Sequence, residues 1–311
     1  TTTALVAHVL RAAGKQAVAG GNLGQAALGL PVLNADGIYV LELSSYQLEM
    51  VQDLKLNAST VLNLTPDHLE RYGDMETYLA AKVRIAEQTK PDSPIVIGID
   101  SPLLEDWVNT EHEGIVGHVQ TISLQGREAE YCITHDGKLM HHGRHMADLT
   151  YFDNLPGPHN WQNIVTAMLI CAPWLSMDIF FKHLRTFNGL PHRMEKIQEL
   201  DGITFINDSK ATNPESTIAA LQSFKNIYWI AGGKAKAEGI KPCLEFLPNV
   251  RAAFLIGEAE NDFCTTLDPH VATIKCDRCG KIGEFQYENS RLHPILGRSE
   301  GWVDLFVEYG N

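Results

Sequence analysis

The chain has 311 residues, of which 44% are hydrophobic, and a formal net charge of −13. Its length favours two domains, and its negative charge, with lysine and arginine scattered along the sequence, argues against a nucleic-acid partner. The sequence has no run of about 18 apolar residues and no signal-peptide pattern, so we expect a cytoplasmic protein without membrane insertion.

An alternation of apolar runs and helical patterns fills the first part of the chain. Residues 3–13 have the pattern of an amphipathic helix that ends at Gly14, and residues 75–88 have a second helical pattern. Strands alternating with helices predict a parallel α/β sheet. Three apolar runs are typical of its buried strands, namely 38–41, 60–62 and 94–97.

The remaining chain repeats this organisation on a smaller scale. Residues 117–145 alternate between apolar and polar around a turn at Asp136-Gly137, which predicts a small antiparallel insert. We therefore expect one domain at 1–189, a smaller α/β domain at 190–270 and an unassigned tail at 271–311. Further helices are predicted near 160–172, 176–186 and 214–223, and further strands near 203–206, 227–230 and 252–256.

Polar side chains gather where the strand at 38–41 ends. Glu42 follows this strand directly, and Ser44, Ser45 and Gln47 come next. Ligands collect at the carboxyl ends of parallel strands, and a carboxylate there could hold Mg²⁺. A strand end with serines that cap a helix is the alternative interpretation.

A second polar segment follows the strand at 60–62. His68 could be another metal ligand, with Asp67 fixing its tautomer, although a capped surface helix beginning at Thr65 would have the same pattern. Lys82 lies among small and apolar residues in the helix at 75–88. An ammonium group near Mg²⁺ would be repelled, so in a metal site this lysine must be distant, neutral or chemically changed.

Three later segments carry polar groups suited to a nucleotide or an amino acid. Asn160 and Asn163 could bind a base or ribose, although Asn160 could instead cap a helix, and Arg193 could reach a phosphate or form a salt bridge. The run Asn207–Asn213 lies between a strand and a helix, a place that suits ligand binding. Gly232 and its neighbours repeat this arrangement, with a plain glycine turn as the alternative.

The cysteines give a weaker signal. Cys276 and Cys279 have the two-residue spacing of a metal knuckle or a redox pair. A single such pair is a weak indication of zinc, and an incidental pair is the favoured interpretation. The six cysteines of the chain do not form the dense pattern of a disulfide scaffold.

Taken in order, these segments resemble the Mur ligase superfamily, and within it the members that add D-glutamate. Asn207–Asn213 is the most discriminating motif, and the resemblance covers roughly residues 1–260. It implies a parallel-sheet, P-loop-type ATPase domain followed by a smaller Rossmann-like α/β domain that binds the amino acid. Thr1-Thr2-Thr3 resembles the helix start after the family's phosphate loop, so we expect a chain that begins after this loop and lacks the domain holding the UDP group.

The resemblance also implies a reaction and residue roles. The family joins D-glutamate to UDP-N-acetylmuramoyl-L-alanine in peptidoglycan synthesis, using ATP, Mg²⁺ and an acyl-phosphate intermediate, and we expect a monomer. Glu42, His68 and Lys82, the last as a carbamate, would bind Mg²⁺. The muramoyl substrate would contact Asn22, Ser44, Ser45 and Gln47; ATP would contact Thr1, Thr2, Asn160, Asn163, His192, Arg193 and Asp208; D-glutamate would contact Lys210, Thr212 and Lys236.

Two other functions stay open at this point. A sister ligase of the folylpolyglutamate type shares the central ATPase layout, although the Asn207–Asn213 run argues against it. A non-catalytic nucleotide-binding or scaffold protein would keep the fold without the phosphate loop.

Overall fold

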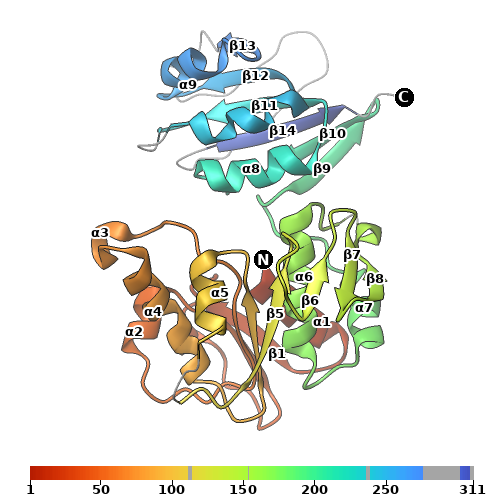
Figure 1. Ribbon diagram of the computed structural model, residues 1–311. Coiled ribbons are helices and arrows are strands. Elements are labelled where there is room, and N and C mark those ends of the chain that lie inside the picture. Colours follow the sequence, from red (N-terminus) through yellow and green to blue (C-terminus); the bar gives the residue numbers. More distant parts are fainter. Residues whose placement is uncertain (111–113, 153, 236–238, 276–301, 309–311) are drawn as a thin grey trace. The chain divides into compact units, whose positions relative to one another are not determined.

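The computed structural model describes residues 1–110, 114–152, 154–235 and 239–275, and the backbone of strand β14, Trp302–Glu308 (Figure 1). The chain divides into two compact units, Thr1–Asn188 and Gly189–Asn311. The first unit has two sheets and the second has one, and each unit has its own buried core. None of the helices within the described ranges is long and apolar enough to cross a membrane.

The first unit contains a two-stranded and a six-stranded sheet. In the small sheet, β1 (Ala17–Gly21) and β2 (Ile38–Glu42) run parallel. The large sheet has its strands in chain order and is parallel from β3 to β6 and antiparallel from β6 to β8. Its strands are β3 (Ser59–Val61), β4 (Pro94–Gly98), β5 (His118–Ser123), β6 (Tyr131–Ile133), β7 (Lys138–His141) and β8 (Arg144–Asp148).

Helices pack against these sheets through their apolar faces. α1 buries Leu5, Val9 and Leu10 and packs against α6, which also contacts β4. Asp74 begins α4 by accepting a hydrogen bond from the Thr77 N–H at 2.7 Å. The helices are α1 (Thr2–Ala12), α2 (Ser45–Met50), α3 (Leu69–Tyr72), α4 (Met75–Glu87), α5 (Pro102–Val108), α6 (Pro158–Cys171) and α7 (Met177–Leu184), with the 3₁₀ turns η1 (Ala27–Gly29) and η2 (Leu149–Tyr151).

The segment 117–145 differs from the separate antiparallel insert predicted from the sequence. The turn around Asp136-Gly137 is present between β6 and β7, and both β6–β7 and β7–β8 are antiparallel. However, β5 pairs in parallel with β4, and β6 pairs in parallel with β5. The segment therefore continues the main sheet, because its first strand has a parallel partner that local alternation does not reveal.

The second unit has one six-stranded sheet in the order β13-β12-β11-β14-β10-β9 (Figure 1). Its core surrounds Trp229 on β11, which is fully buried together with Leu221 and Ala253. Helix α8 begins at Asn213, whose side chain accepts the Ser216 N–H at 2.9 Å. The elements are β9 (Glu195–Leu200), β10 (Ile203–Asn207), β11 (Ile227–Gly232), β12 (Val250–Ile256), β13 (Ala272–Lys275), α8 (Pro214–Ser223), η3 (Lys241–Asn249) and α9 (Glu260–Leu267).

The sheet of the second unit continues past residue 270, the limit expected from the sequence. β13 pairs in parallel with β12, and β14 lies antiparallel between β10 and β11. Strand β14 joins neighbours that are about 70 to 100 residues away in the sequence, and such long-range pairing leaves no local pattern. The predicted α/β class with parallel sheets is confirmed.

Gly98, the last residue of β4, tests how closely the strands and helices of the first unit pack. An added Cβ would overlap the carbonyl oxygen of Leu62, which also accepts a hydrogen bond from Gln162 Nε2 at 2.9 Å. We expect Gly98→Ala to lower the free energy of unfolding by about 1–3 kcal/mol in urea denaturation. The control, Gly29→Ala, meets only the flexible Gln25 side chain and should change stability by less than about 0.5 kcal/mol. Equal midpoints for the two variants would contradict this account of the packing.

Candidate active site

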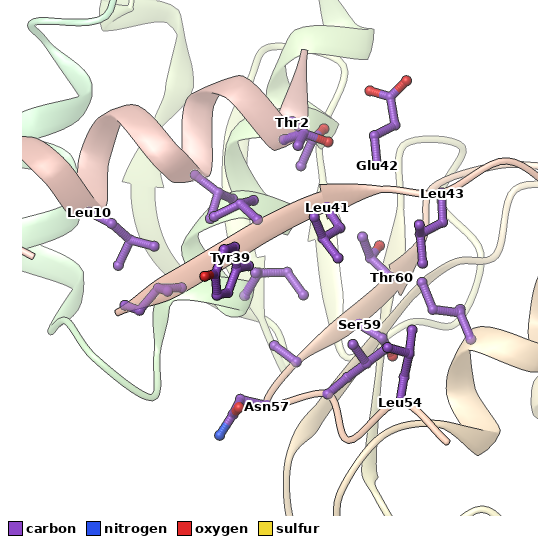
Figure 2. A pocket seen from close by; sticks show the side chains of 18 of the residues that line it. Thr2, Leu10, Tyr39, Leu41, Glu42, Leu43, Leu54, Asn57, Ser59 and Thr60 are labelled. Carbon is purple, nitrogen blue, oxygen red and sulfur yellow. The ribbon is translucent and has the colours of Figure 1, made fainter. Parts of the chain in front are cut away.

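A cavity of about 1200 Å³ lies in the first unit beside the edges of β2 and β3 (Figure 2). The N-terminal end of α1 contributes Thr1 and Thr2, β2 contributes Glu42, and α4 contributes Lys82. Figure 2 shows Thr2 and Glu42 at the same end of the cavity. The structure thus brings four predicted site residues from three separate segments to one space.

Glu42 is held at the end of β2 by its pairing with β1. The backbone N–H of Asn22 donates to the Glu42 carbonyl at 2.7 Å, and Asn22 Nδ2 donates to Glu42 Oε1 at 3.4 Å. Gly21, with φ of +99°, lies so close to the Glu42 carbonyl that an added Cβ would overlap it. Asn22 therefore contacts the predicted metal ligand, although it does not line the cavity itself.

The surroundings of Lys82 lower the pKa of its amine. It is half-buried on α4, and desolvation by this burial lowers the pKa of Lys82, while the nearby Asp67 charge opposes the shift. Its Nζ lies 5.0 Å from the centre of the Tyr78 ring, one helical turn earlier. Burial likewise raises the pKa of Tyr78 to about 12, so this hydroxyl stays protonated at neutral pH.

His68 lies beside Tyr78 but is not among the residues that line the cavity. It begins α3 in the left-handed conformation, with φ of 54°. His68 Nε2 is 3.4 Å from Asp67 Oδ2, and the His68 ring lies 5.1 Å from that of Tyr46. Tyr78 thus lies next to both His68 and Lys82, whereas Glu42 lies at the end of β2 and shares only the cavity lining with Lys82.

Ser44 and Gln47, predicted to contact substrate, are engaged in capping α2. The Ser44 N–H donates to Gln47 Oε1 at 2.8 Å, and the Gln47 N–H donates to Ser44 Oγ at 3.3 Å. Ser45 is buried, and none of the three lines the cavity. The capping interpretation of this segment is therefore realised, and a substrate contact for these residues stays a prediction.

Three of the residues predicted to contact ATP form one hydrogen-bonded chain between α1 and α6. Thr2 Oγ1 donates to Asn163 Oδ1 at 2.7 Å, Asn163 Nδ2 donates to Asn160 Oδ1 at 3.1 Å, and Asn160 Nδ2 donates to the Pro156 carbonyl at 2.8 Å. Thr2 and Asn160 are buried. Beside them, desolvation lowers the pKa of His159 to about 4, so its ring is neutral at pH 7.

Asn63 and Tyr78 belong to this region but were not among the predicted site residues. Asn63 lines the cavity just after β3, and Tyr78 lies under Lys82. Two signals could have found them: a polar residue directly after a buried strand, and the four-residue spacing of Tyr78 from Lys82 on one helix face.

In the second unit, the loop before β9 is tied to the end of β10. Asn207 Nδ2 and His192 Nδ1 are 2.9 Å apart, and the Lys210 N–H donates to the His192 carbonyl at 3.0 Å. Buried Asp208 accepts a hydrogen bond from the Met194 N–H at 2.9 Å. These bonds bring His192 and Asp208 together and leave the side chain of Arg193, which lies between His192 and Met194, exposed.

Lys210 and Thr212, predicted to face D-glutamate, are exposed just after β10. Thr212 lines a small cavity of about 50 Å³ with Trp229 and Lys234, a lysine that was not among the predicted site residues. Lys236 and the Cys276/Cys279 pair lie outside the residues that the structure describes.

Comparison with known families gives two matches that follow one another along the chain. The model of the Mur ligase middle domain matches residues 1–171. The model of the Mur ligase glutamate ligase domain matches residues 192–275. The first match includes Glu42, His68 and Lys82, and the second includes the Asn207–Asn213 run.

Several curated relatives share substantial sequence identity with this chain. The UDP-N-acetylmuramoylalanine–D-glutamate ligase of Paramagnetospirillum magneticum is 44% identical over 278 residues, which are 89% of this chain and 60% of that protein. The enzymes of the same name from Caulobacter sp. and Rhodospirillum rubrum are 40% and 42% identical. The chain spans about 60% of the length of the curated relatives it matches.

Solved structures share the fold at lower identity. MurF from Acinetobacter baumannii aligns with a TM-score of 0.64 and 17% identity, over 88% of this chain and 64% of that chain. MurC from Thermotoga maritima aligns with a TM-score of 0.63 and 18% identity, over 89% of this chain and 64% of that chain.

Proposed function

This chain belongs to the Mur ligase family, and on that premise we propose that it is the catalytic part of an ATP-dependent ligase joining D-glutamate to UDP-N-acetylmuramoyl-L-alanine. The identity to relatives that carry this name supports the choice of substrates. The proposed reaction passes through an acyl phosphate, which the amine of D-glutamate attacks. Cytoplasmic location and a monomeric state stay predictions.

The observation that carries the proposal is the convergence of Glu42, Lys82 and Thr2 on one cavity. Each comes from a different segment, at the end of β2, in the middle of α4 and at the start of α1. Phosphoryl-transfer sites use carboxylates and threonine hydroxyls to hold the metal ion and lysines to position the phosphates, and all three types of group line this cavity.

The donor set at this cavity fits Mg²⁺. Glu42 supplies carboxylate oxygen, which hard divalent cations prefer. Burial lowers the pKa of Lys82 and so raises the fraction of neutral amine, the form that can add to the carbon of CO₂. This addition forms an N–C bond, releases one proton and leaves an anionic carbamate. When bound, Mg²⁺ supplies positive charge that offsets the repulsion between triphosphate and carboxylate.

The other predicted residues then have roles that their surroundings allow. Thr2 at the start of α1 is hydrogen-bonded to Asn163 on α6, and this pair would orient the nucleotide. His68 stays a proposed metal ligand, and the centre of its ring is 6.2 Å from that of Tyr78. In the second unit, exposed Lys210 and Thr212 could pair with the carboxylates of D-glutamate.

We expect the full-length protein to release ADP and phosphate only when both UDP-N-acetylmuramoyl-L-alanine and D-glutamate are supplied. A coupled ADP assay measures this, with L-lysine and diaminopimelate each replacing D-glutamate. Turnover with either replacement should fall at least about 100-fold. A binding site discriminates strongly against a substrate that leaves the polar groups of the site unpaired. Equal turnover with one of these amino acids would reject D-glutamate as the substrate.

A further inference from the structure

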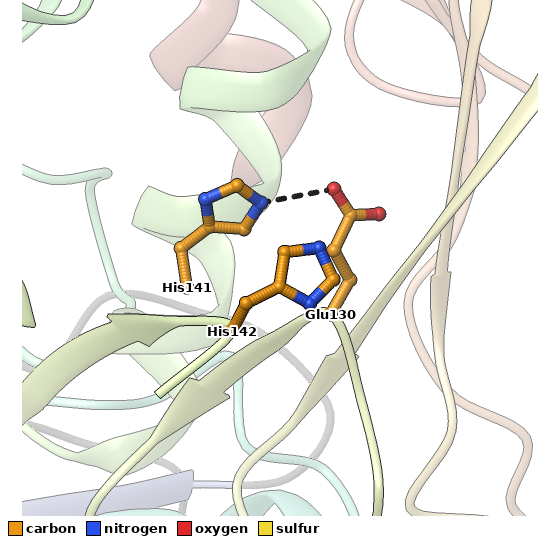
Figure 3. A group of neighbouring side chains, drawn as sticks. All are labelled: Glu130, His141 and His142. Atoms are coloured by element: carbon orange, nitrogen blue, oxygen red, sulfur yellow. Dashed lines mark hydrogen bonds and ion pairs between the residues drawn. The ribbon is translucent and has the colours of Figure 1, made fainter. Parts of the chain in front are cut away.

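We propose that Glu130, His141 and His142 form a binding site for a divalent transition-metal ion, with Zn²⁺ as the probe (Figure 3). Each side chain offers one ligand atom, and these atoms all lie within 4.8 Å of one another. No other group of three or more histidine, cysteine or acidic side chains in the described part of the chain meets this condition. The site has no part in the proposed ligase reaction.

The β6–β7 hairpin brings the first and last of these residues together. Tyr131 on β6 is directly opposite His141 on β7. Glu130 precedes β6, His142 follows β7, and the His142 N–H donates to the Glu130 carbonyl at 3.1 Å. This hydrogen bond places Glu130 next to His142 just beyond the last paired residues of the hairpin.

The turn after β7 brings His142 to the same side as His141. His142 and Gly143 form the two-residue connection to β8, and both have positive φ, 45° and 74°. Positive φ at both central residues is typical of a type I′ turn. Consecutive residues of an uninterrupted strand point to opposite faces, whereas here the two rings lie 4.5 Å apart between their centres.

The distance between two of the ligand atoms is already close to the distance between two ligands of a bound zinc ion. His141 Nε2 lies 3.2 Å from Glu130 Oε1. Because zinc bonds to nitrogen and oxygen are about 2.0–2.2 Å, two ligands of a tetrahedral ion lie about 3.4 Å apart. The His141 ring stacks on Tyr131 with centres 4.4 Å apart, which holds the imidazole in place before any ion arrives. The ligand atom of His142 lies within 4.8 Å of the other two.

The chemistry of the three groups selects the class of ion. Two imidazoles and one carboxylate suit zinc and neighbouring transition metals better than Mg²⁺ or Ca²⁺, which prefer oxygen alone. Glu130 and His141 are half-buried and His142 is exposed, so an ion can enter from solvent and keep water as its remaining ligand. Bound there, it would link the start of β6 to the β7–β8 turn and stabilise the folded state.

The experiment titrates ZnCl₂ into the metal-stripped full-length protein by calorimetry, comparing the parent with Glu130→Gln, His142→Asn and the control His135→Asn. His135 is an exposed histidine in the turn at the other end of the same hairpin. We expect the parent to bind one equivalent of zinc at this site. The affinity for this zinc ion should fall at least about tenfold in Glu130→Gln and His142→Asn and should stay unchanged in the control. The rise in Tm caused by zinc should shrink in the same two variants.

Two results would overturn the proposal. Unchanged zinc binding in all three variants would place the ion elsewhere. Weaker zinc binding in Glu130→Gln alone would show that His142 is not a ligand of the ion. Since His142 is exposed and asparagine accepts positive φ, His142→Asn should keep the parent Tm in EDTA, so its lost zinc affinity would report on the missing imidazole and not on unfolding.

Discussion

Lys82→Ala should lower ligase turnover by about 10²–10³-fold or more, because it would remove the proposed carbamate ligand of Mg²⁺ and with it charge stabilisation of the transferred phosphate. The lysine is half-buried against Tyr78 at the cavity shared with Glu42, and burial lowers its pKa. Alanine cannot form a carbamate, so added bicarbonate should not restore turnover. A steady-state ADP assay with saturating substrates measures the loss.

The matched control is Lys138→Ala, an exposed lysine on β7 that does not line the cavity and whose Nζ lies 2.6 Å from Asp136 Oδ2 on the surface. It should retain turnover within about twofold, as expected for a surface site away from the cavity. A second readout is the carbamate signal of the parent in ¹³C NMR with labelled bicarbonate, which should disappear in Lys82→Ala. Wild-type turnover in Lys82→Ala would show that no carbamate is needed.

Trp229→Ala should produce the largest loss of stability in the second unit. The indole is fully buried in the core, where it packs with Leu221 and Ala253. Removing a buried tryptophan side chain leaves a cavity and typically costs about 3–5 kcal/mol. The change can be followed as a shift of the urea midpoint for the second unit, monitored by hydrogen exchange of the α8 amides.

Two comparisons make this result specific. Trp229→Phe keeps much of the apolar volume and should cost less than half as much. Leu28→Ala, at a side chain that is fully exposed in the first unit, should stay within about 0.5 kcal/mol of the parent. A Trp229→Ala midpoint as close to the parent as that of Leu28→Ala would contradict the central role of the indole in this core.

Much of the fold could be predicted because its signals are local. The helix pattern at 75–88 corresponds to α4 at Met75–Glu87, and the apolar run at 94–97 corresponds to β4 at Pro94–Gly98. Strand partners could not be predicted in the same way. β14 pairs with β10 and β11, about 70 to 100 residues earlier, and these partners depend on tertiary packing that no window of residues contains.

In the candidate site, too, local features could be predicted from the sequence and tertiary contacts could not. Polar residues after a buried strand predicted a ligand site at the end of β2, and Glu42 at this position lines the cavity. The sequence could not decide between two uses of Ser44 and Gln47, because a capping box and a substrate contact require the same side chains. The direct bond between Thr2 and Asn163, 161 residues apart, likewise follows from the packing of α1 on α6.

The hydrogen-bonded chain from Pro156 to Thr2 runs in one direction only. A carbonyl oxygen can only accept, so the Pro156 carbonyl fixes the amide orientation of Asn160, which in turn fixes that of Asn163. The Thr2 hydroxyl therefore donates its single proton to Asn163, and only the lone pairs of its oxygen are available for a further interaction. This oxygen can ligate a hard cation or accept from a donor, but it cannot donate to a phosphate oxygen without giving up its bond to Asn163.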